Sequence, residues 1–118
     1  MRSQPLPRPR LGEVWSVTFD PVRGHEQGGV RPGLVISNDR FNRTPHTFCI
    51  LVPLTRTDRG IPSHIPVHPP EGGVRDVSFV LCEQAKSLSV SRLHRRLGTV
   101  DPSTAERVQA MVGLFIDR

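Results

Sequence analysis

Several residue types that large classes of proteins depend on are scarce in this sequence. There are only two cysteines, Cys49 and Cys82, and there is no tyrosine among the 118 residues. Both cysteines lie in apolar runs, so we expect reduced thiols in a core rather than a disulfide framework. No run approaches the roughly 20 apolar residues of a membrane-spanning helix, and the leader lacks the apolar stretch of a signal peptide. We therefore expect a cytoplasmic protein.

Motifs for metal or nucleotide chemistry are missing as well. The five histidines are scattered, and the chain contains neither C-x-x-C nor H-E-x-x-H. It has no G-x-x-x-x-G-K-[ST] loop, and no predicted helix follows the glycines of Gly24–Gly29, as a dinucleotide fingerprint would require. We therefore expect no metal and no cofactor, so that the side chains themselves supply any chemistry.

Lysine is nearly absent, whereas arginine is abundant. Of the 16 basic residues only Lys86 is a lysine, and the formal net charge is +5. Arginine grips a phosphate through two parallel hydrogen bonds, although a GC-rich genome would produce the same bias. Three arginines lie in residues 1–10; without them 13 basic residues face 11 acidic ones, a net of +2. Charge alone is therefore weak support for a nucleic-acid partner.

The length predicts a single domain preceded by a short arm. Residues 1–10, MRSQPLPRPR, are typical of a flexible, basic, proline-rich arm. We expect residues 11–118 to form the domain. The 12 prolines and 10 glycines of the chain favour a β-rich or α+β fold over a helical bundle, because both residues break helices.

Short apolar runs and alternation predict about six strands. Pro66 cannot donate to a sheet ladder, so its strand is expected at an edge. The predicted strands are Glu13–Phe19, a strand that begins at Leu34–Ile36, Thr47–Leu54, His64–His68, Val77–Cys82 and Leu97–Val100.

The best predicted helix lies at the C-terminus. Asp101 is a suitable N-cap and Pro102 a suitable first residue. An apolar stripe at three- and four-residue spacing then follows, consisting of Ala105, Val108, Val112 and Phe115, widened by Met111 and Ile116. A second helix is predicted over Ser89–Arg96, and Ser37–Asp39 can cap a short helical turn. Together these elements predict a small, strongly curved sheet or barrel with a helix packed on it.

Polar residues gather in the loops at the ends of the buried strands. The loop Asp20–Arg31 is long and rich in glycine, and long ordered loops tend to be functional. Thr55 ends one buried strand, and Glu83 and Gln84 end another. Each residue alone could be an ordinary surface or turn residue, but together they form the one candidate site in the chain.

Three segments, in this order, resemble the motifs of the MazF/PemK family of toxins. The first is GEVW at Gly12–Trp15 followed by GHEQGGVRPGLVISND at Gly24–Asp39, the second is VPLT at Val52–Thr55, and the third is LCEQAKSLSVSRL at Leu81–Leu93. The resemblance runs from about Gly12 to the C-terminus. It implies an SH3-like or CcdB-like β-barrel with a C-terminal α-helix, assembled as a homodimer.

The resemblance also implies a function. Such a protein is the toxin of a toxin–antitoxin module, an endoribonuclease that cleaves single-stranded RNA at specific sequences. Its partner is an antitoxin whose acidic, disordered tail lies in the RNA groove. The family's catalytic arginine falls on Arg31 in the G-G-x-R-P stretch, and its catalytic threonine falls on Thr55. Its substrate-contacting loop falls on Arg23–Gln27, and its Glu–Gln pair on Glu83 and Gln84.

The reaction that the resemblance implies is a metal-independent transesterification by the ribose 2′-OH. The guanidinium of Arg31 would stabilise the dianionic phosphorane, and the hydroxyl of Thr55 would donate to a non-bridging oxygen. Arginine stays protonated and is a poor base. Glu26 or His25, in the same loop as Arg31, could take the 2′-OH proton, although His25 could equally be a solvated loop residue.

The sequence departs from the family pattern at two places. His25 stands where relatives often have Ser or Arg, and Gly33 replaces a small aliphatic residue. The first departure concerns which RNA sequence is cut, not the class of reaction. The candidate RNA-contacting residues are Arg23, Gln27, Ser37, Asn38, Arg56, His64, Glu83 and Gln84.

Two alternatives from other functional classes share this fold. A CcdB-like toxin inhibits gyrase and cuts nothing, and it needs no phosphate-activating pair. A non-catalytic nucleic-acid-binding barrel would use its arginines only for phosphate contact, with salt-dependent binding and no strand cleavage. Both alternatives predict that Arg31→Ala changes an affinity but no chemical rate.

Overall fold

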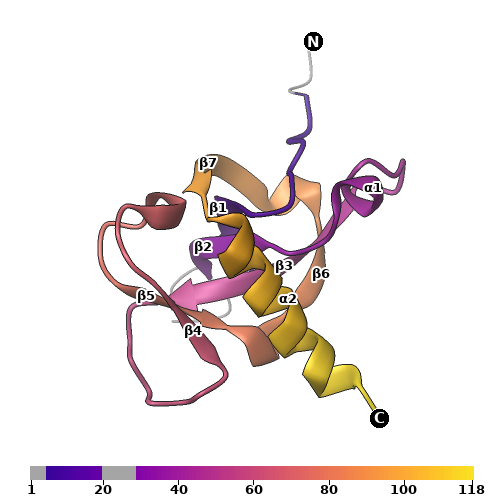
Figure 1. Cartoon of the computed structure of the whole chain (residues 1–118). Coiled ribbons are helices and arrows are strands. Elements are labelled where there is room, and N and C mark those ends of the chain that lie inside the picture. Colours follow the sequence, from indigo (N-terminus) through magenta and orange to yellow (C-terminus); the bar gives the residue numbers. More distant parts are fainter. Residues whose placement is uncertain (1–4, 20–28) are drawn as a thin grey trace, which may run out of the picture.

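The computed structural model describes residues 5–19 and 29–118, and their main feature is one strongly bent antiparallel sheet (Figure 1). Within these residues the strand order is β4-β5-β3-β2-β1-β7, and β6 pairs with β3. The strands are β1 Glu13–Thr18, β2 Val30–Val35, β3 Phe48–Thr55, β4 His64–Val67, β5 Ser78–Leu81, β6 Lys86–Ser89 and β7 Leu93–Thr99. The helices are α1 Asp39–Asn42 and α2 Pro102–Ile116, and the 3-10 turns are η1 Glu71–Gly73, η2 Cys82–Gln84 and η3 Val90–Arg92.

The sheet bends because one side of β3 has two successive partners. Its second half pairs with β5, where Leu54 lies opposite Val80, and its first half pairs with β6, where Cys49 lies opposite Leu88. The short turn η2 joins these two partners. The result is a small barrel-like sheet that does not close, since β4 and β7 end the strand order. This confirms the predicted fold class of a small β-barrel with a C-terminal helix.

Most strands begin and end within a few residues of the predicted positions. The strand around Pro66 is at the edge of the sheet, as its missing donor predicted. The predicted helix Ser89–Arg96 is wrong. This segment contains the end of β6, the turn η3 and the start of β7, and Leu93 lies opposite Val17 of β1. The three-residue spacing of Val90 and Leu93 resembles a helical stripe, but long-range pairing decides the structure.

The helix α2 begins at Pro102, as predicted, but the side chain of Asp101 makes no capping hydrogen bond. Glu71 of η1 supplies the acceptor instead. Its Oε2 accepts hydrogen bonds from the backbone N–H of Asp101 at 2.9 Å and from the hydroxyl of Thr104 at 2.5 Å. The predicted cap residue is therefore in place, while the capping carboxylate comes from a turn 30 residues earlier in the chain.

Buried side chains form two clusters on opposite faces of the sheet. One cluster lies under α2 and includes Leu34, Val52 and Val108. The other faces away from α2 and includes Val17, Val35 and Leu51. Because strand side chains alternate between faces, neighbouring residues of β2 belong to different clusters. The apolar stripe of α2 is buried only in its first half: Leu114, Phe115 and Ile116 are exposed.

Both cysteines are free and buried, as predicted. Cys49 belongs to the cluster that faces away from α2, and Cys82 belongs to the cluster beneath it. Burial raises the pKa of the Cys49 thiol to about 12 and that of the Cys82 thiol to about 11. Both therefore stay protonated and unreactive near neutral pH. In the described part of the chain, no helix is long and apolar enough to cross a membrane.

The described part of the N-terminal arm, residues 5–10, extends away from the domain and is anchored to it by its last residues (Figure 1). Pro9 is buried, and the backbone N–H of Arg10 donates to Oε1 of Glu13 at 2.8 Å. The backbone N–H of Leu11 donates to Oδ1 of Asp39 at 2.7 Å, and Arg10 pairs with the same carboxylate at 3.8 Å. These contacts hold the start of β1 and the arm against α1.

Candidate active site

The sheet register brings the two predicted catalytic residues to the same place. In the β2–β3 ladder Gly33 lies opposite Pro53 and Leu34 opposite Val52. The pairing of β2 with β3 ends at Gly33 and Pro53; extended by two residues, the same register would set Arg31 opposite Thr55. Directly opposed residues of antiparallel strands point to the same face, with Cβ atoms roughly 4.5–5.5 Å apart. Arg31 lies where β2 begins and Thr55 lies where the adjacent strand β3 ends.

Each of these residues keeps hydrogen-bonding capacity for a ligand. The side chain of Thr55 is half-buried, and its Oγ1 accepts a hydrogen bond from the backbone N–H of Thr57 at 3.2 Å. A hydroxyl that accepts from the backbone still has its own proton to donate. Arg31 is exposed, and none of the ion pairs found among the described residues involves it. A guanidinium and a hydroxyl donor thus face the same space.

The ring of Phe19 explains why residue 33 is glycine. A Cβ on Gly33 would lie 2.7 Å from Cζ of Phe19, which is closer than real Cβ atoms approach, and 3.1 Å from Cγ2 of Val17, which is a tight contact. Phe19 therefore occupies the volume that the small aliphatic residue of the family pattern would fill. This packing holds the ring between β1 and β2, two residues along the strand from Arg31.

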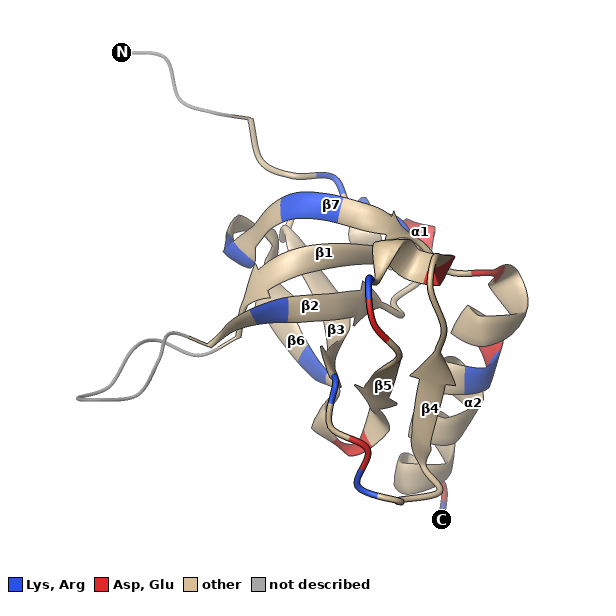
Figure 2. Cartoon of the chain, turned by 90° about the vertical axis from the view of Figure 1, so that its left-hand side faces the viewer, with Lys and Arg blue, Asp and Glu red and all other residues tan. Residues whose placement is uncertain are grey.

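Lys86 adds a second cation on this face, and the sequence analysis did not assign it to the site. It lies opposite Leu51 in the β3–β6 ladder, and Leu51 faces the same way as Thr55 because the two are four residues apart. Its Nζ is 6.0 Å from the centroid of the Phe19 ring. Figure 2 shows basic segments on β2, β6 and β7. The alternation of KSLS is the sequence signal for β6, which was not among the predicted strands.

Arg56 follows Thr55 directly and is largely exposed. It forms an ion pair with Asp76 at 3.4 Å, with 78% and 63% of the two side chains exposed. An exposed pair of this kind contributes little to stability, so a ligand phosphate can replace Asp76. Asp76 was not among the predicted site residues, because it lies 20 residues from Arg56 in the chain and no motif surrounds it.

His64 and Glu83 form a hydrogen-bonded pair beside the site. Nε2 of His64 is 3.0 Å from both carboxylate oxygens of Glu83. A carboxylate only accepts, so Nε2 carries a proton. Partial burial is the largest single effect and opposes ionisation of Glu83. The hydrogen bond from His64, a backbone hydrogen bond and the nearby charge of Arg59 together outweigh it, and they hold the pKa of Glu83 below its ordinary value. Glu83 is therefore a fixed, ionised acceptor, and the adjacent Gln84 is exposed.

The burial of His64 corrects its predicted role. Only 2% of its side chain is exposed, so it cannot contact a phosphate directly. Within the described residues its Nδ1 has no hydrogen-bond partner. Its position on β4, facing η2, makes it the residue that orients Glu83.

Ser37 and Asn38 have structural roles in the turn before α1. Ser37 is buried; its hydroxyl donates to Oδ1 of Asn42 and accepts from the backbone N–H of Ile50 at 2.9 Å. Ser37 is therefore not available to RNA, contrary to the prediction. Oδ1 of Asn38 accepts from the backbone N–H of Phe41 at 2.8 Å, which confirms the predicted cap.

The remaining predicted residues lie in the loop before β2. Arg23, His25, Glu26 and Gln27 are outside the described residues. Across residues 5–19 and 29–118, no three side chains of His, Cys, Asp or Glu come together as a metal site would require. Arg31, Thr55 and Lys86 are the candidate polar groups of the site that lie on described strands.

Known proteins resemble this chain in sequence and in fold. Residues 10–116 match the model of a family described as PemK-like, MazF-like toxin of type II toxin-antitoxin system. The chain is 33% identical to the endoribonuclease MazF of Staphylococcus saprophyticus, covering 91% of this chain and 90% of that protein. It is 30% identical to the endoribonuclease MazF9 of Mycobacterium tuberculosis, covering 92% and 96%. A solved MazE–MazF structure from Deinococcus radiodurans is similar with a TM-score of 0.77 and 29% identity, covering 92% and 96%.

Proposed function

Because the chain belongs to the PemK-like, MazF-like toxin family of type II toxin–antitoxin systems, and is thus a toxin endoribonuclease, we propose that it cuts single-stranded RNA at a specific sequence by metal-independent transesterification. The observation that supports this most directly is the register that, extended by two residues, would set Arg31 opposite Thr55. A guanidinium and a hydroxyl donor on one sheet face can bind two oxygens of the same phosphate.

In the proposed reaction the ribose 2′-OH attacks the adjacent phosphorus, and the 5′-oxygen leaves. The products are a 2′,3′-cyclic phosphate and a 5′-hydroxyl. Charge develops on the non-bridging oxygens of the phosphorane, where the guanidinium of Arg31 stabilises it. The Thr55 hydroxyl donates to one of these oxygens and fixes the phosphate for in-line attack. DNA lacks the 2′-OH and is not cut.

A separate group must accept the 2′-OH proton, since arginine stays protonated. We propose Glu26 or His25, because both belong to the loop that leads into Arg31. A double variant, Glu26→Ala with His25→Ala, is expected to lose the base and to show a much lower single-turnover rate. An unchanged rate would exclude both residues.

Recognition of the RNA sequence is proposed for the same loop and for η2. The ionised Glu83 can accept hydrogen bonds from base amino and imino groups, and the exposed Gln84 can both donate and accept. His64 acts on this step only by holding Glu83. Arg23, Gln27 and Arg56 are the further proposed contacts, and Asn38 is kept as a contact at the exposed end of α1.

The proposed partners are a cognate antitoxin and a second copy of the chain. The antitoxin is expected to carry an acidic, disordered tail that competes with RNA for the site. Two similar structures support an antitoxin as a partner: an endoribonuclease with its cognate antitoxin from a mycobacterial species, and the MazE–MazF structure. The exposed Leu114, Phe115 and Ile116 at the end of α2 supply an apolar surface for an interface.

The test is cleavage of a long single-stranded RNA in excess EDTA, with the unmodified protein, Arg31→Ala and the matched control Arg118→Ala. The expected result is discrete cuts with 5′-hydroxyl ends by the unmodified protein and the control, and none by Arg31→Ala. Cuts that require a divalent cation would refute the metal-independent step. If nothing is cut, gyrase inhibition and RNA binding without cleavage become the functions to measure.

A further inference from the structure

A groove of about 790 Å³ lies far from Arg31 and Thr55, between the N-terminal arm and α1. Pro7 and Pro9 of the arm form one wall, and Asn42 and Arg43 form the other. Thr47 and Val90 also line it. The volume is within the roughly 300–1,000 Å³ of typical ligand sites. Residues 5–9, which form one wall of this groove, lie before the family match at residues 10–116.

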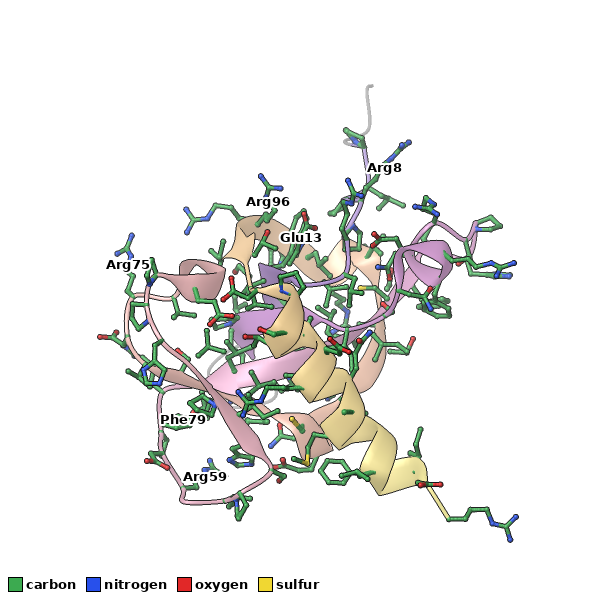
Figure 3. All side chains as sticks on the ribbon, in the orientation of Figure 1. Arg8, Glu13, Arg59, Arg75, Phe79 and Arg96 are labelled. Atoms are coloured by element: carbon green, nitrogen blue, oxygen red, sulfur yellow. The ribbon has the colours of Figure 1, made fainter. Side chains whose placement is uncertain are left out.

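The wall that the arm forms is held by specific contacts. The backbone N–H groups of Arg10 and Leu11 donate to Glu13 and Asp39, and Arg10 also pairs with Asp39. Glu13 is buried and pairs with Arg96 at 3.2 Å, and Figure 3 shows these two side chains near the base of the arm. Two carboxylates therefore fix residues 10 and 11, and the prolines before them limit how far the wall can bend.

The groove carries positive charge on an apolar surface. Arg8, Arg10 and Arg43 line it, against Asp39 as its one acidic residue. The hydrogen bond from Leu11 is the largest effect on Asp39 and holds its pKa below the ordinary value, so it stays ionised beside Arg10. None of the ion pairs in the described part of the chain involves Arg8 or Arg43. Two guanidinium groups thus remain for an anion.

We propose that this groove binds one or more nucleotides of the RNA substrate, away from the bond that is cut. This inference rests on the proposed function, which supplies the single-stranded polyanion. The phosphates would pair with Arg8 and Arg43, while a base would pack on the proline surface of the arm. An acidic peptide without aromatic residues would satisfy the arginines but would offer no flat ring for the apolar wall.

The distance between the groove and the active site suits one RNA strand. Thr47, in the groove, immediately precedes β3, and Thr55 ends that strand. The eight residues of β3 span roughly 24 Å. Small OB-fold barrels contact roughly 4–16 nucleotides of a single strand, which covers such a distance. RNA held at both places would be oriented along β3.

The experiment measures RNA binding in the Arg31→Ala background, which prevents cleavage. Two RNAs that share the cleavage sequence are compared, one of about 4 and one of about 16 nucleotides. The double variant Arg8→Ala, Arg43→Ala is expected to bind the long RNA more weakly. The slope of the logarithm of the binding constant against the logarithm of the salt concentration should become shallower by about 1.4, because each lost phosphate contact of a single strand removes about 0.7 from it. Binding of the short RNA should not change.

The matched control is Arg40→Ala with Arg118→Ala, which removes the same charge outside the groove; Arg40 lies on α1 itself. An equal loss in both double variants, or an equal loss for both RNAs, would overturn the proposal. Loss of binding to a poly-glutamate peptide with unchanged RNA binding would assign the groove to a protein partner and also overturn it. If the unmodified protein cuts RNA and the variant Arg8→Ala, Arg43→Ala binds the long RNA normally, only the groove proposal fails. If the unmodified protein neither cuts nor binds RNA, the proposed function itself fails.

Discussion

Replacing Gly33 by alanine tests the packing that supports the candidate site. The new Cβ would lie 2.7 Å from Cζ of Phe19, whereas unstrained carbon atoms stay about 3.5–4.0 Å apart. The ring must therefore move by roughly 1 Å. Phe19 is only 5% exposed and packs with Val17. Overpacking of this kind typically costs about 1–3 kcal/mol, and we expect the lower half of that range because the clash is with the end of a side chain that can tilt.

The assay is urea unfolding followed by the fluorescence of Trp15, the single tryptophan of the chain, which packs against the same cluster as Phe19. The partner variant Phe19→Leu removes Cζ and makes room for the new methyl group. In a double-mutant cycle we expect a favourable coupling of about 1 kcal/mol between the two substitutions. The cleavage rate of Gly33→Ala should also fall, since a displacement of about 1 Å near a catalytic group can cost about a hundredfold.

Two results would refute this reasoning. One is a Gly33→Ala protein whose free energy of unfolding is within about 0.5 kcal/mol of the original, which is the size expected for a substitution without a clash. The other is strict additivity with Phe19→Leu, which would mean that the ring does not determine the residue at position 33.

Three further predictions concern other parts of the structure. Gly98→Ala should destabilise the protein by about 1–3 kcal/mol, because its Cβ would lie 2.5 Å from the backbone N of Gly73; a urea midpoint equal to that of the unmodified protein would contradict this. Lys86→Gln should lower the salt slope of RNA binding by about 0.7, and an unchanged slope would remove Lys86 from the interface. Glu83→Gln tests the His64 pair through pH. The pKa of Glu83 is lower in the folded state than in the unfolded state. The ionised side chain therefore stabilises the fold at pH values above the unfolded-state pKa, and this stabilisation is lost as the pH falls through the folded-state pKa. The difference in urea midpoint between the unmodified protein and Glu83→Gln should therefore shrink as the solution is acidified from neutral pH; a constant difference would mean that the pair does not act through ionisation.

The parts of the fold that sequence reasoning predicted are those fixed by local pattern. Alternation identified β1, an apolar run identified β3, and Pro102 marked the start of α2. Features that depend on distant segments were missed. Nothing near Glu71 indicates that it caps α2, and nothing near Leu93 indicates that it pairs with β1. These contacts arise only once the sheet has bent.

The site was predictable to a similar extent. Arg31 and Thr55 were identified through the motifs around them, and the register then gave an independent reason for their proximity. Lys86 and Asp76 were not identified, because each reaches the site through a strand pairing or an ion pair that no short motif encodes. His64 was predicted to contact RNA, whereas in the structure it is buried against Glu83, a contact that no local pattern encodes.

The central claim is that Arg31 and Thr55 act together on one phosphate. The most direct test is a double-mutant cycle on the single-turnover cleavage rate in EDTA, with Arg31→Ala, Thr55→Ala and the double variant. Loss of one such donor typically slows a reaction by about 10²–10³. If both residues stabilise the same phosphorane, the double variant should be little slower than the slower single variant, because residues that act as a unit are not additive. Fully additive losses, or a single variant that cuts at the original rate, would contradict the account.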